Sequence, residues 1–139
     1  MVKASMTWKG GLKFEGRGQF GHTIVTDVAR SAGGEESGHK PTELLLWGIA
    51  GCTGVDVIRI LEKQRQKVTA LEIEVIGYQP EERPKPFNKI EVKYHFKGEN
   101  LDPRKIAMAI ELSESKYCVV SQTVRYPGEV ITSFDVSEE

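Results

Sequence analysis

Pro41 to Lys63 reads PTELLLWGIAGCTGVDVIRILEK, and this stretch decides the fold. Its apolar residues point in almost every direction around the axis of the helix that it forms. A helix that is apolar on all sides is buried on all sides. These residues are Leu44, Leu45, Leu46, Trp47, Ile49, Ala50, Val55, Val57, Ile58, Ile60 and Leu61. One small sheet cannot cover such a helix, so we expect a dimer in which two chains enclose their central helices.

The middle of this helix carries a stripe of reactive and charged side chains. Cys52 is followed by Asp56, Arg59 and Lys63. At about 100° per residue, these side chains lie on one side of the helix. The stripe is either a reaction site or the side of the helix that meets water. Asp56 and Arg59 also have the spacing of an ion pair on a helix surface.

Shorter segments on both sides of the central helix alternate polar and apolar residues, as strands do. Glycines separate the first of them, which predicts an antiparallel meander, and prolines separate a later pair, which predicts a hairpin. The predicted strands are Ala4–Lys9, Leu12–Arg17, His22–Asp27, Leu71–Gln79, Lys89–Lys97 and Val130–Val136. A second helix begins at Asp102-Pro103, and Ser113–Thr123 starts another. The order predicts one α+β domain over residues 1–139.

The composition excludes several classes of protein. The 139 residues include 19 Lys and Arg against 20 Asp and Glu, so neither nucleic acid nor a membrane surface is an expected partner. Two cysteines are too few for a disulfide-stapled secreted fold. No signal-peptide core is visible, and glycines and charges interrupt the apolar helix, which makes it a poor membrane span. We expect a soluble cytoplasmic protein.

Cys52 is either a small core residue or a reactive thiol. A free cysteine on an apolar helix is usually packed, and burial raises the pKa of such a thiol and makes it inert. Gly48, Gly51 and Gly54 surround it, and each glycine costs a helix about 1 kcal/mol against alanine. That cost is tolerated where a second backbone or a ligand comes close. The glycines therefore indicate either helix packing or an open approach to the sulfur.

Cys118 is the second cysteine of the chain. We expect Ser115 to cap a helix whose first turn holds Lys116 and Cys118. The positive end of that helix and the lysine would lower the pKa of the Cys118 thiol. A cysteine in this position is more often only packed. As a partner for Cys52, however, it is the natural resolving thiol, because two-cysteine peroxide chemistry needs a second thiol to condense with a sulfenic acid.

Two motifs carry a family resemblance. The first is Gly38-x-x-Pro41-x-Glu43-Leu44 followed by Gly51-Cys52 and Asp56-Val57, and the second is Ser115-Lys116-Tyr117-Cys118. They resemble the two cysteine motifs of the OsmC/Ohr family, most closely of its OsmC-like branch with a Gly-Cys-x-x-x-Asp-Val pattern. The resemblance covers nearly the whole chain. It implies antiparallel sheets packed around a long central helix in an intertwined homodimer, with two active sites at the subunit interface.

The same resemblance implies an activity. Characterised members of the family are thiol peroxidases that reduce organic hydroperoxides in the defence against oxidative stress. Cys52 would then be the peroxidatic cysteine and Cys118 the resolving one. An external thiol reductant would clear the disulfide that they form.

The resemblance also implies residues that activate the first cysteine. The family uses an arginine from its N-terminal segments, for which Arg30 and Arg17 are the candidates here. It also uses a glutamate that usually follows the proline directly, where this chain has Thr42. Glu43 stands one place later, at a position where some members carry an acid.

Two other functions stay open. The chain could bind a small molecule without turnover, with Cys52 as a packing residue. It could also perform other cysteine chemistry, such as hydrolysis or thiol transfer, with Asp56 as the acid or base. No nucleotide or flavin is implied. His22, His39 and His95 lack ligand spacing, so no metal site is expected from them and the cysteines.

Overall fold

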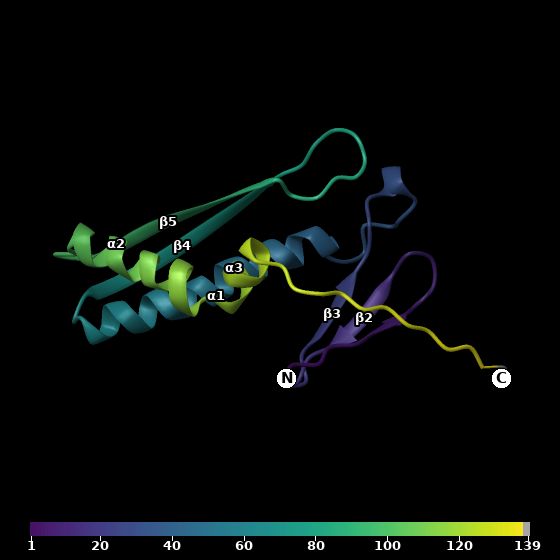
Figure 1. Ribbon diagram of the computed structural model, residues 1–139, viewed down its shortest axis with the longest axis horizontal. Coiled ribbons are helices and arrows are strands. Elements are labelled where there is room, and N and C mark those ends of the chain that lie inside the picture. The colour runs from purple at the N-terminus through teal and green to yellow at the C-terminus, as the bar shows by residue number, and fades with distance from the viewer. Residues whose placement is uncertain (138–139) are drawn as a thin grey trace. The chain divides into compact units, whose positions relative to one another are not determined.

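The chain is an α+β fold with two antiparallel sheets and a long helix between them in sequence (Figure 1). The structure is a computed structural model and describes residues 1–137. The elements are β1 (Met6–Trp8), β2 (Phe14–Arg17), β3 (Thr23–Thr26), η1 (Arg30–Ala32), α1 (Pro41–Lys63), β4 (Lys67–Tyr78), β5 (Lys89–Glu99), α2 (Pro103–Leu112), η2 (Ser113–Tyr117) and α3 (Val119–Arg125). They divide into two units, Met1–Gly48 with Val75–Glu91, and Ile49–Glu74 with the chain from Val92 onward.

The first unit contains the predicted meander. Strands β1, β2 and β3 pair in that order, and both pairs are antiparallel, with Met6 opposite Gly16 and Glu15 opposite Val25. The alternation of polar and apolar residues located all three strands to within two residues or so, because each turn between them contains glycine. Gly10 and Gly11 in the first turn have positive φ angles of 97° and 56°, which glycine adopts without steric cost.

The loop between β3 and α1 is organised by one buried carboxylate. The side chain of Asp27 accepts hydrogen bonds from the backbone of Val28 (2.8 Å), Glu35 (3.2 Å) and Ser37 (3.1 Å) and from the Ser37 hydroxyl (2.6 Å). The Ser37 hydroxyl, followed by the backbone bond from Val28, lowers the pKa of Asp27 to about 2. The loop between Thr26 and Pro41 is therefore folded around Asp27. Loops this long are often functional.

Helix α1 begins and ends at the predicted residues. Proline opens it, because the first N–H of a helix needs no partner. The carboxylate of Glu43 turns back and accepts a hydrogen bond from the backbone N–H of Lys40 at 3.0 Å. Glu43 therefore lies in the first turn and closes the start of the helix.

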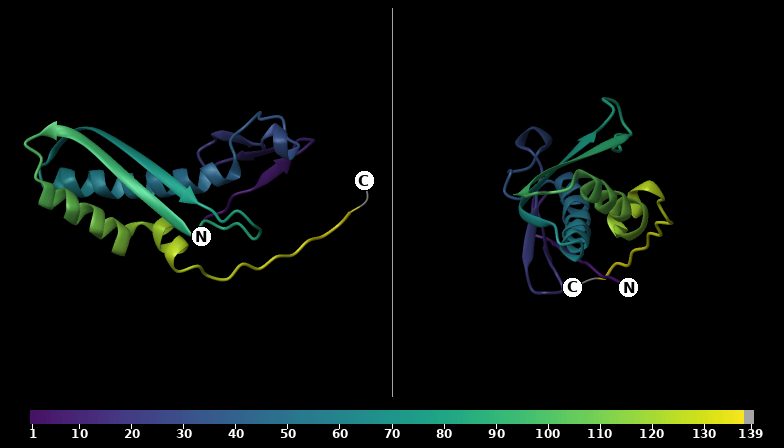
Figure 2. Two further views of the ribbon diagram at one scale, coloured as in Figure 1. Left: turned by 90° about the horizontal axis from the view of Figure 1, so that it is seen from above. Right: turned by 90° about the vertical axis from the view of Figure 1, so that its left-hand side faces the viewer.

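The second unit holds the hydrophobic core. Val57 and Leu61 of α1 pack with Ala109 of α2, and all three are fully buried. Figure 2 shows α2 running alongside α1 in this unit. The partly buried residues that complete the core come from α1, the β4–β5 hairpin and α2; they are Ile60, Val68, Tyr94, Phe96, Ile106 and Ile110.

One chain covers only one side of α1. Its buried residues are Ile49, Thr53, Val57 and Leu61, which recur every four residues and form a single stripe. Other apolar side chains of the helix stay exposed, among them Trp47 and Val55, each 51% exposed. The apolar pattern all around the helix therefore exceeds what its own chain buries.

Helix α1 also has the length and composition of a membrane span, with an 18-residue window of mean hydropathy 1.7. Core helices of soluble proteins meet the same criteria, so length and composition alone do not distinguish a membrane span from a core helix. Its packing against α2 is that of a core helix.

The predicted last strand is wrong. Residues 130–136 alternate apolar and polar side chains, but they form no strand in the structure, and Val130, Ile131, Phe134 and Val136 are exposed. A strand needs a neighbour to satisfy its backbone, and alternation alone does not supply one. The hairpin strands, in contrast, are longer than predicted, at Lys67–Tyr78 and Lys89–Glu99.

Candidate functional site

Two cysteines and an aspartate meet in the second unit. The Sγ atoms of Cys52 and Cys118 and a carboxylate oxygen of Asp56 all lie within 4.8 Å of one another. Cys52 and Asp56 are four residues apart on α1, which puts them on one side of that helix. Both cysteines are free; Cys52 is half-buried and Cys118 is fully buried. The structure thus brings the two predicted site cysteines together.

A widened helical turn places Cys118. The segment η2 is a π-helix, and the backbone N–H of Cys118 reaches the carbonyl of Ser113, five residues earlier, at 2.8 Å. The chain then leaves helical geometry at Cys118, which has φ −75° and ψ 103°. Single π-turns inside helices are rare and occur frequently at functional sites.

Cys118 is the N-cap of α3, which corrects the sequence prediction. We expected Ser115 to be the cap and Cys118 to lie in the first turn. Instead, the Cys118 sulfur accepts a hydrogen bond from the backbone N–H of Ser121 at 3.4 Å, while the Ser115 hydroxyl donates to the carbonyl of Glu111. The π-turn shifts the start of the helix by three residues, and no residue pattern in the sequence indicates such a turn.

Burial raises the pKa of the Cys118 thiol, contrary to the expected lowering. Loss of hydration is the largest cause, because a buried thiolate loses the water that would stabilise it. The hydrogen bonds from Ser121 oppose the rise, and the neighbouring Cys52 adds to it. Cys118 is therefore held as a neutral thiol at neutral pH.

A chain of buried hydroxyl groups ends at Asp56. Ser113 donates to the Asp56 carboxylate at 3.0 Å, and its oxygen also lies 2.8 Å from the hydroxyl of Thr53. Thr53 lies in turn 2.9 Å from the hydroxyl of Tyr94. Because the single Ser113 proton is used on Asp56, Thr53 must donate to Ser113, and the Tyr94 proton is then shared between Thr53 and the Glu114 carboxylate. The protons of Ser113 and Thr53 then point toward the Asp56 carboxylate.

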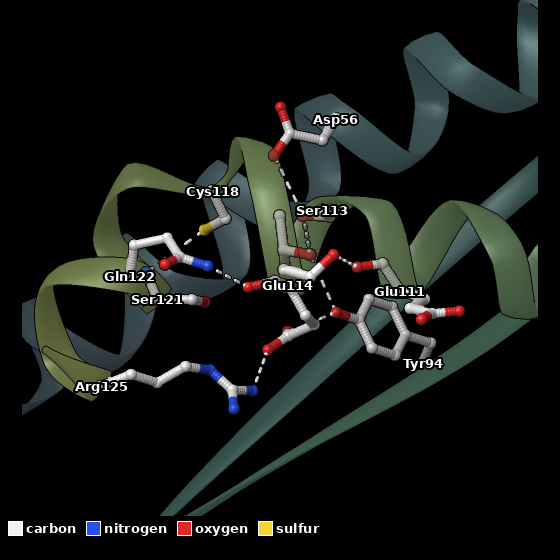
Figure 3. Close-up of polar contacts among 11 residues, drawn as sticks. Asp56, Tyr94, Glu111, Ser113, Glu114, Cys118, Ser121, Gln122 and Arg125 are labelled. Atoms are coloured by element: carbon white, nitrogen blue, oxygen red, sulfur yellow. Dashed lines mark hydrogen bonds and ion pairs between the residues drawn. The ribbon is translucent and has the colours of Figure 1, made fainter.

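An ion pair lies at the Tyr94 end of this row of hydrogen-bonded hydroxyl groups. Glu114 forms a salt bridge with Arg125 at 2.5 Å, and one of its oxygens lies 3.4 Å from the Tyr94 hydroxyl (Figure 3). The side chain of Gln122 donates to the Glu114 carbonyl. Burial raises the pKa of Tyr94, the hydrogen bond with Thr53 opposes the rise, and the Glu114 charge adds to it. These contacts hold α3, and with it Cys118, against η2.

Asp56 does not have the partner that its helix spacing predicts. Within residues 1–137, no ion pair joins Asp56 to Arg59, and Asp56 instead bonds to Ser113. Sequence reasoning did not assign Ser113, Thr53 or Tyr94 to the site. Thr53 stands beside Cys52 on a mostly apolar helix, and a polar residue in that setting is a signal of a buried polar contact.

The other candidate residues belong to the first unit and have local surroundings of their own. Arg30 forms an exposed salt bridge with Glu36 at 3.1 Å, and Glu36 also accepts from the Arg30 backbone. Arg17 ends strand β2 and is exposed. Glu43 bonds to the backbone of Lys40 at the start of α1.

Fold and site together define a class: small α+β proteins whose long central helix presents one cysteine to a second, buried cysteine. The chain belongs to the OsmC-like protein family, whose model matches residues 33–133. It is 30% identical to the protein YhfA of Escherichia coli over 135 residues, which cover 97% of this chain and 98% of that protein.

Solved structures agree with this assignment. A hypothetical protein from Aquifex aeolicus is 32% identical and superposes with a TM-score of 0.79, over 91% of this chain and 89% of that one. The organic hydroperoxide resistance protein OhrB of Bacillus subtilis is 21% identical, with a TM-score of 0.60 over 91% of this chain and 93% of that one. The second likeness concerns the fold alone.

Proposed function

We propose that this protein is a thiol-dependent peroxidase that reduces organic hydroperoxides through Cys52 and Cys118. The observation that carries the proposal is the placement of two free thiols side by side, one half-buried and one fully buried. Membership of the OsmC-like family supports the chemistry. The name of the Bacillus subtilis relative supports the substrate class.

Cys52 reacts first, because a peroxide reaches a half-buried sulfur before a fully buried one. Its thiolate attacks the hydroperoxide, an S–O bond forms, the O–O bond breaks, and the alcohol leaves after taking up a proton. The product is a sulfenic acid on Cys52. The sulfur of Cys118 then attacks it, a disulfide forms and water leaves. Two equivalents of an external thiol restore the reduced pair.

Asp56 takes part in the second step. Cys118 is neutral at rest, because burial raises its pKa, and it must lose a proton to attack. The Asp56 carboxylate lies within 4.8 Å of both sulfurs and is the nearby group that can accept this proton. Ser113, which donates to Asp56, holds the carboxylate in position.

Arg30 or Arg17 stabilises the Cys52 thiolate and orients the peroxide in this proposal, as the family resemblance implies. Glu43 contributes less, since its carboxylate already bonds to the start of α1. The working form is a homodimer in the cytoplasm, in which the exposed apolar residues of α1, such as Trp47 and Val55, are covered by a second chain. An apolar interface of this kind would favour organic hydroperoxides over hydrogen peroxide.

The test is mass spectrometry of the reduced protein after one equivalent of cumene hydroperoxide. Wild-type protein should lose two hydrogens as the disulfide forms. Cys118→Ser should instead gain one oxygen at Cys52, and Cys52→Ser should stay unchanged. Retention of peroxide reduction in Cys52→Ser would reverse the assigned roles, and the absence of oxidation in the wild type would refute the activity.

A second candidate function is favoured by the position of Asp56. A carboxylate beside two thiols can act as acid or base in thiol transfer or hydrolysis. In that case a thioester substrate, and not a hydroperoxide, should be turned over by the wild type. The rate should fall in Asp56→Asn, whereas the peroxidase predicts that no thioester is turned over by either protein.

A further inference from the structure

Three side chains that bind metals lie together at the cysteine pair. They are the two thiols and the Asp56 carboxylate, with ligand atoms within 4.8 Å of one another. Cys52 and Asp56 share one side of α1, and Cys118 comes from the start of α3. Because Cys118 is far from Cys52 and Asp56 in sequence, the spacing of residues along the chain does not reveal the cluster. The cluster contains no histidine.

We propose that the reduced protein binds one Zn²⁺ per chain through Cys52, Asp56 and Cys118. Tetrahedral zinc holds thiolate and carboxylate ligand atoms about 3.5 to 3.8 Å apart. The three groups begin within 4.8 Å, so small side-chain rotations bring them to this geometry. Two thiolates with one carboxylate suit zinc better than magnesium or calcium, and the fourth position is left to water.

The surroundings of the three ligands orient them. The Ser113 hydroxyl donates to Oδ2 of Asp56 at 3.0 Å, and the backbone N–H of Ser121 donates to the Cys118 sulfur at 3.4 Å. Ser113 and Cys118 are fully buried, so both are fixed before any ion arrives. Donors of this kind, bonded to metal ligands, typically raise metal affinity.

Charge also favours a cation here. Once ionised, three ligands whose atoms lie within 4.8 Å of one another would repel each other in the absence of a cation. Zn²⁺ offsets two of the three negative charges, so the thiols give up their protons to the solvent as the metal binds. The apparent affinity should therefore rise with pH.

Zinc binding and disulfide formation exclude each other, because both use the same sulfur electron pairs. When a hydroperoxide or diamide oxidises the zinc-bound pair, two electrons pass from the thiolates to the oxidant, which takes its protons from the solvent; the S–S bond forms and Zn²⁺ leaves. The metal would thus protect the thiols in the resting protein. This inference uses the reduced thiols only and does not depend on peroxide turnover.

The test is metal binding by the full-length reduced protein, stripped of metal and kept free of oxygen. Zn²⁺ is titrated against a chromophoric chelator, and Cd²⁺ is titrated in parallel, because cadmium thiolates absorb ultraviolet light. Both titrations should saturate at one equivalent per chain. Cys52→Ser, Cys118→Ser and Asp56→Asn should each weaken zinc binding by about tenfold or more. Glu62→Gln, which changes an exposed acid of the same helix, should leave it unchanged.

Prior oxidation with diamide, which accepts two electrons and two protons from the thiols, should abolish binding by the wild type. No cadmium absorption in the wild type at one equivalent would overturn the proposal, whether or not any variant folds. Wild-type affinity in Asp56→Asn would overturn the three-ligand set. Neither readout needs a peroxide, so a failed peroxidase assay leaves the result interpretable.

Discussion

Ser113 is the residue on which the hydrogen bonds of the site converge. Its hydroxyl donates to Asp56 and accepts from Thr53, and both Ser113 and Thr53 are fully buried. A buried hydroxyl without a partner is costly, whereas each of these is satisfied by the next. The serine therefore ties α1 to the start of η2, and the positions of Asp56 and Cys118 depend on it.

Ser113→Ala should destabilise the protein by about 1 to 3 kcal/mol, because it removes the buried hydroxyl to which Thr53 donates and from which Asp56 accepts. Urea unfolding measures the loss. Ser115→Ala is the matched control, since Ser115 is exposed and its hydroxyl bonds to the carbonyl of Glu111, and it should stay within about 0.5 kcal/mol of the wild type. Equal losses in the two variants would contradict the proposed role of Ser113.

The activating arginine can also be tested by single substitutions. Arg30→Ala or Arg17→Ala should slow alkylation of Cys52 at neutral pH by about tenfold, equal to about 1.4 kcal/mol of lost thiolate stabilisation. Glu43→Gln should have little effect, because the glutamine oxygen can still accept from Lys40. Alkylation rates are measured across pH in a Cys118→Ser background. Unchanged rates in both arginine variants would leave Cys52 without its proposed activator.

At the scale of elements, the sequence predicted those whose ends carry local signals. Proline at the start of α1, Asp102 as the N-cap of α2, and glycines between the first strands each fixed a boundary. Asp102 does accept from the backbone of Arg104 at 2.9 Å, as a cap should. Such signals involve residues a few positions apart and can be recognised in the amino-acid sequence alone.

Features that depend on tertiary contacts were not predicted. The π-turn of η2 lies where α2 passes into α3 and has no residue pattern of its own, and the alternation of residues 130–136 predicts a strand although nothing within residues 1–137 pairs with it. The roles of Cys52 and Cys118 came from the family resemblance. The hydroxyl chain was missed because Thr53, Tyr94 and Ser113 come from α1, β5 and η2 and meet only in the folded chain.

The loop held by Asp27 gives a prediction about pH. Because the folded pKa of Asp27 is lowered to about 2 from 3.8, its ionised form stabilises the fold above about pH 4, and this contribution is lost as the pH falls toward 2. Asp27→Asn should lower the unfolding temperature at neutral pH, and the difference from the wild type should shrink across that acid range. Thermal unfolding at several pH values measures it.

Asp135→Asn is the control for this experiment, because Asp135 is exposed and lies outside any helix or strand. It should unfold like the wild type at every pH. A difference between Asp27→Asn and the wild type that stays constant down to pH 2 would show that the carboxylate charge does not hold the loop.

At the scale of the whole molecule, α1 exposes apolar side chains that its own chain does not cover. The helix buries one stripe in its own chain and leaves others exposed, including Trp47 and Val55. Large contiguous apolar patches on a protein surface usually mark an interface. We therefore propose that a second copy of the chain covers this surface.

Sedimentation at low micromolar concentration should give about twice the chain mass of 15.5 kDa. Val55→Lys should shift the protein toward monomer, because a lysine would be buried without a partner in the dimer. Met108→Lys is the matched control on α2, since Met108 is 53% exposed, and it should remain dimeric. A stable wild-type monomer would refute the proposed interface.

The π-turn of η2 has a consequence for how this chemistry could be lost during evolution. In this turn, a backbone N–H bonds to the carbonyl five residues earlier. Insertion of one residue into an ordinary helix produces such a turn. Removing a single residue, for example Lys116, would let the turn close to ordinary helical geometry and rotate everything after it by about 100°. Both cysteines would survive in the sequence, yet their sulfurs would no longer face each other. A descendant could therefore keep every named site residue and still have lost the pair through a change in length alone.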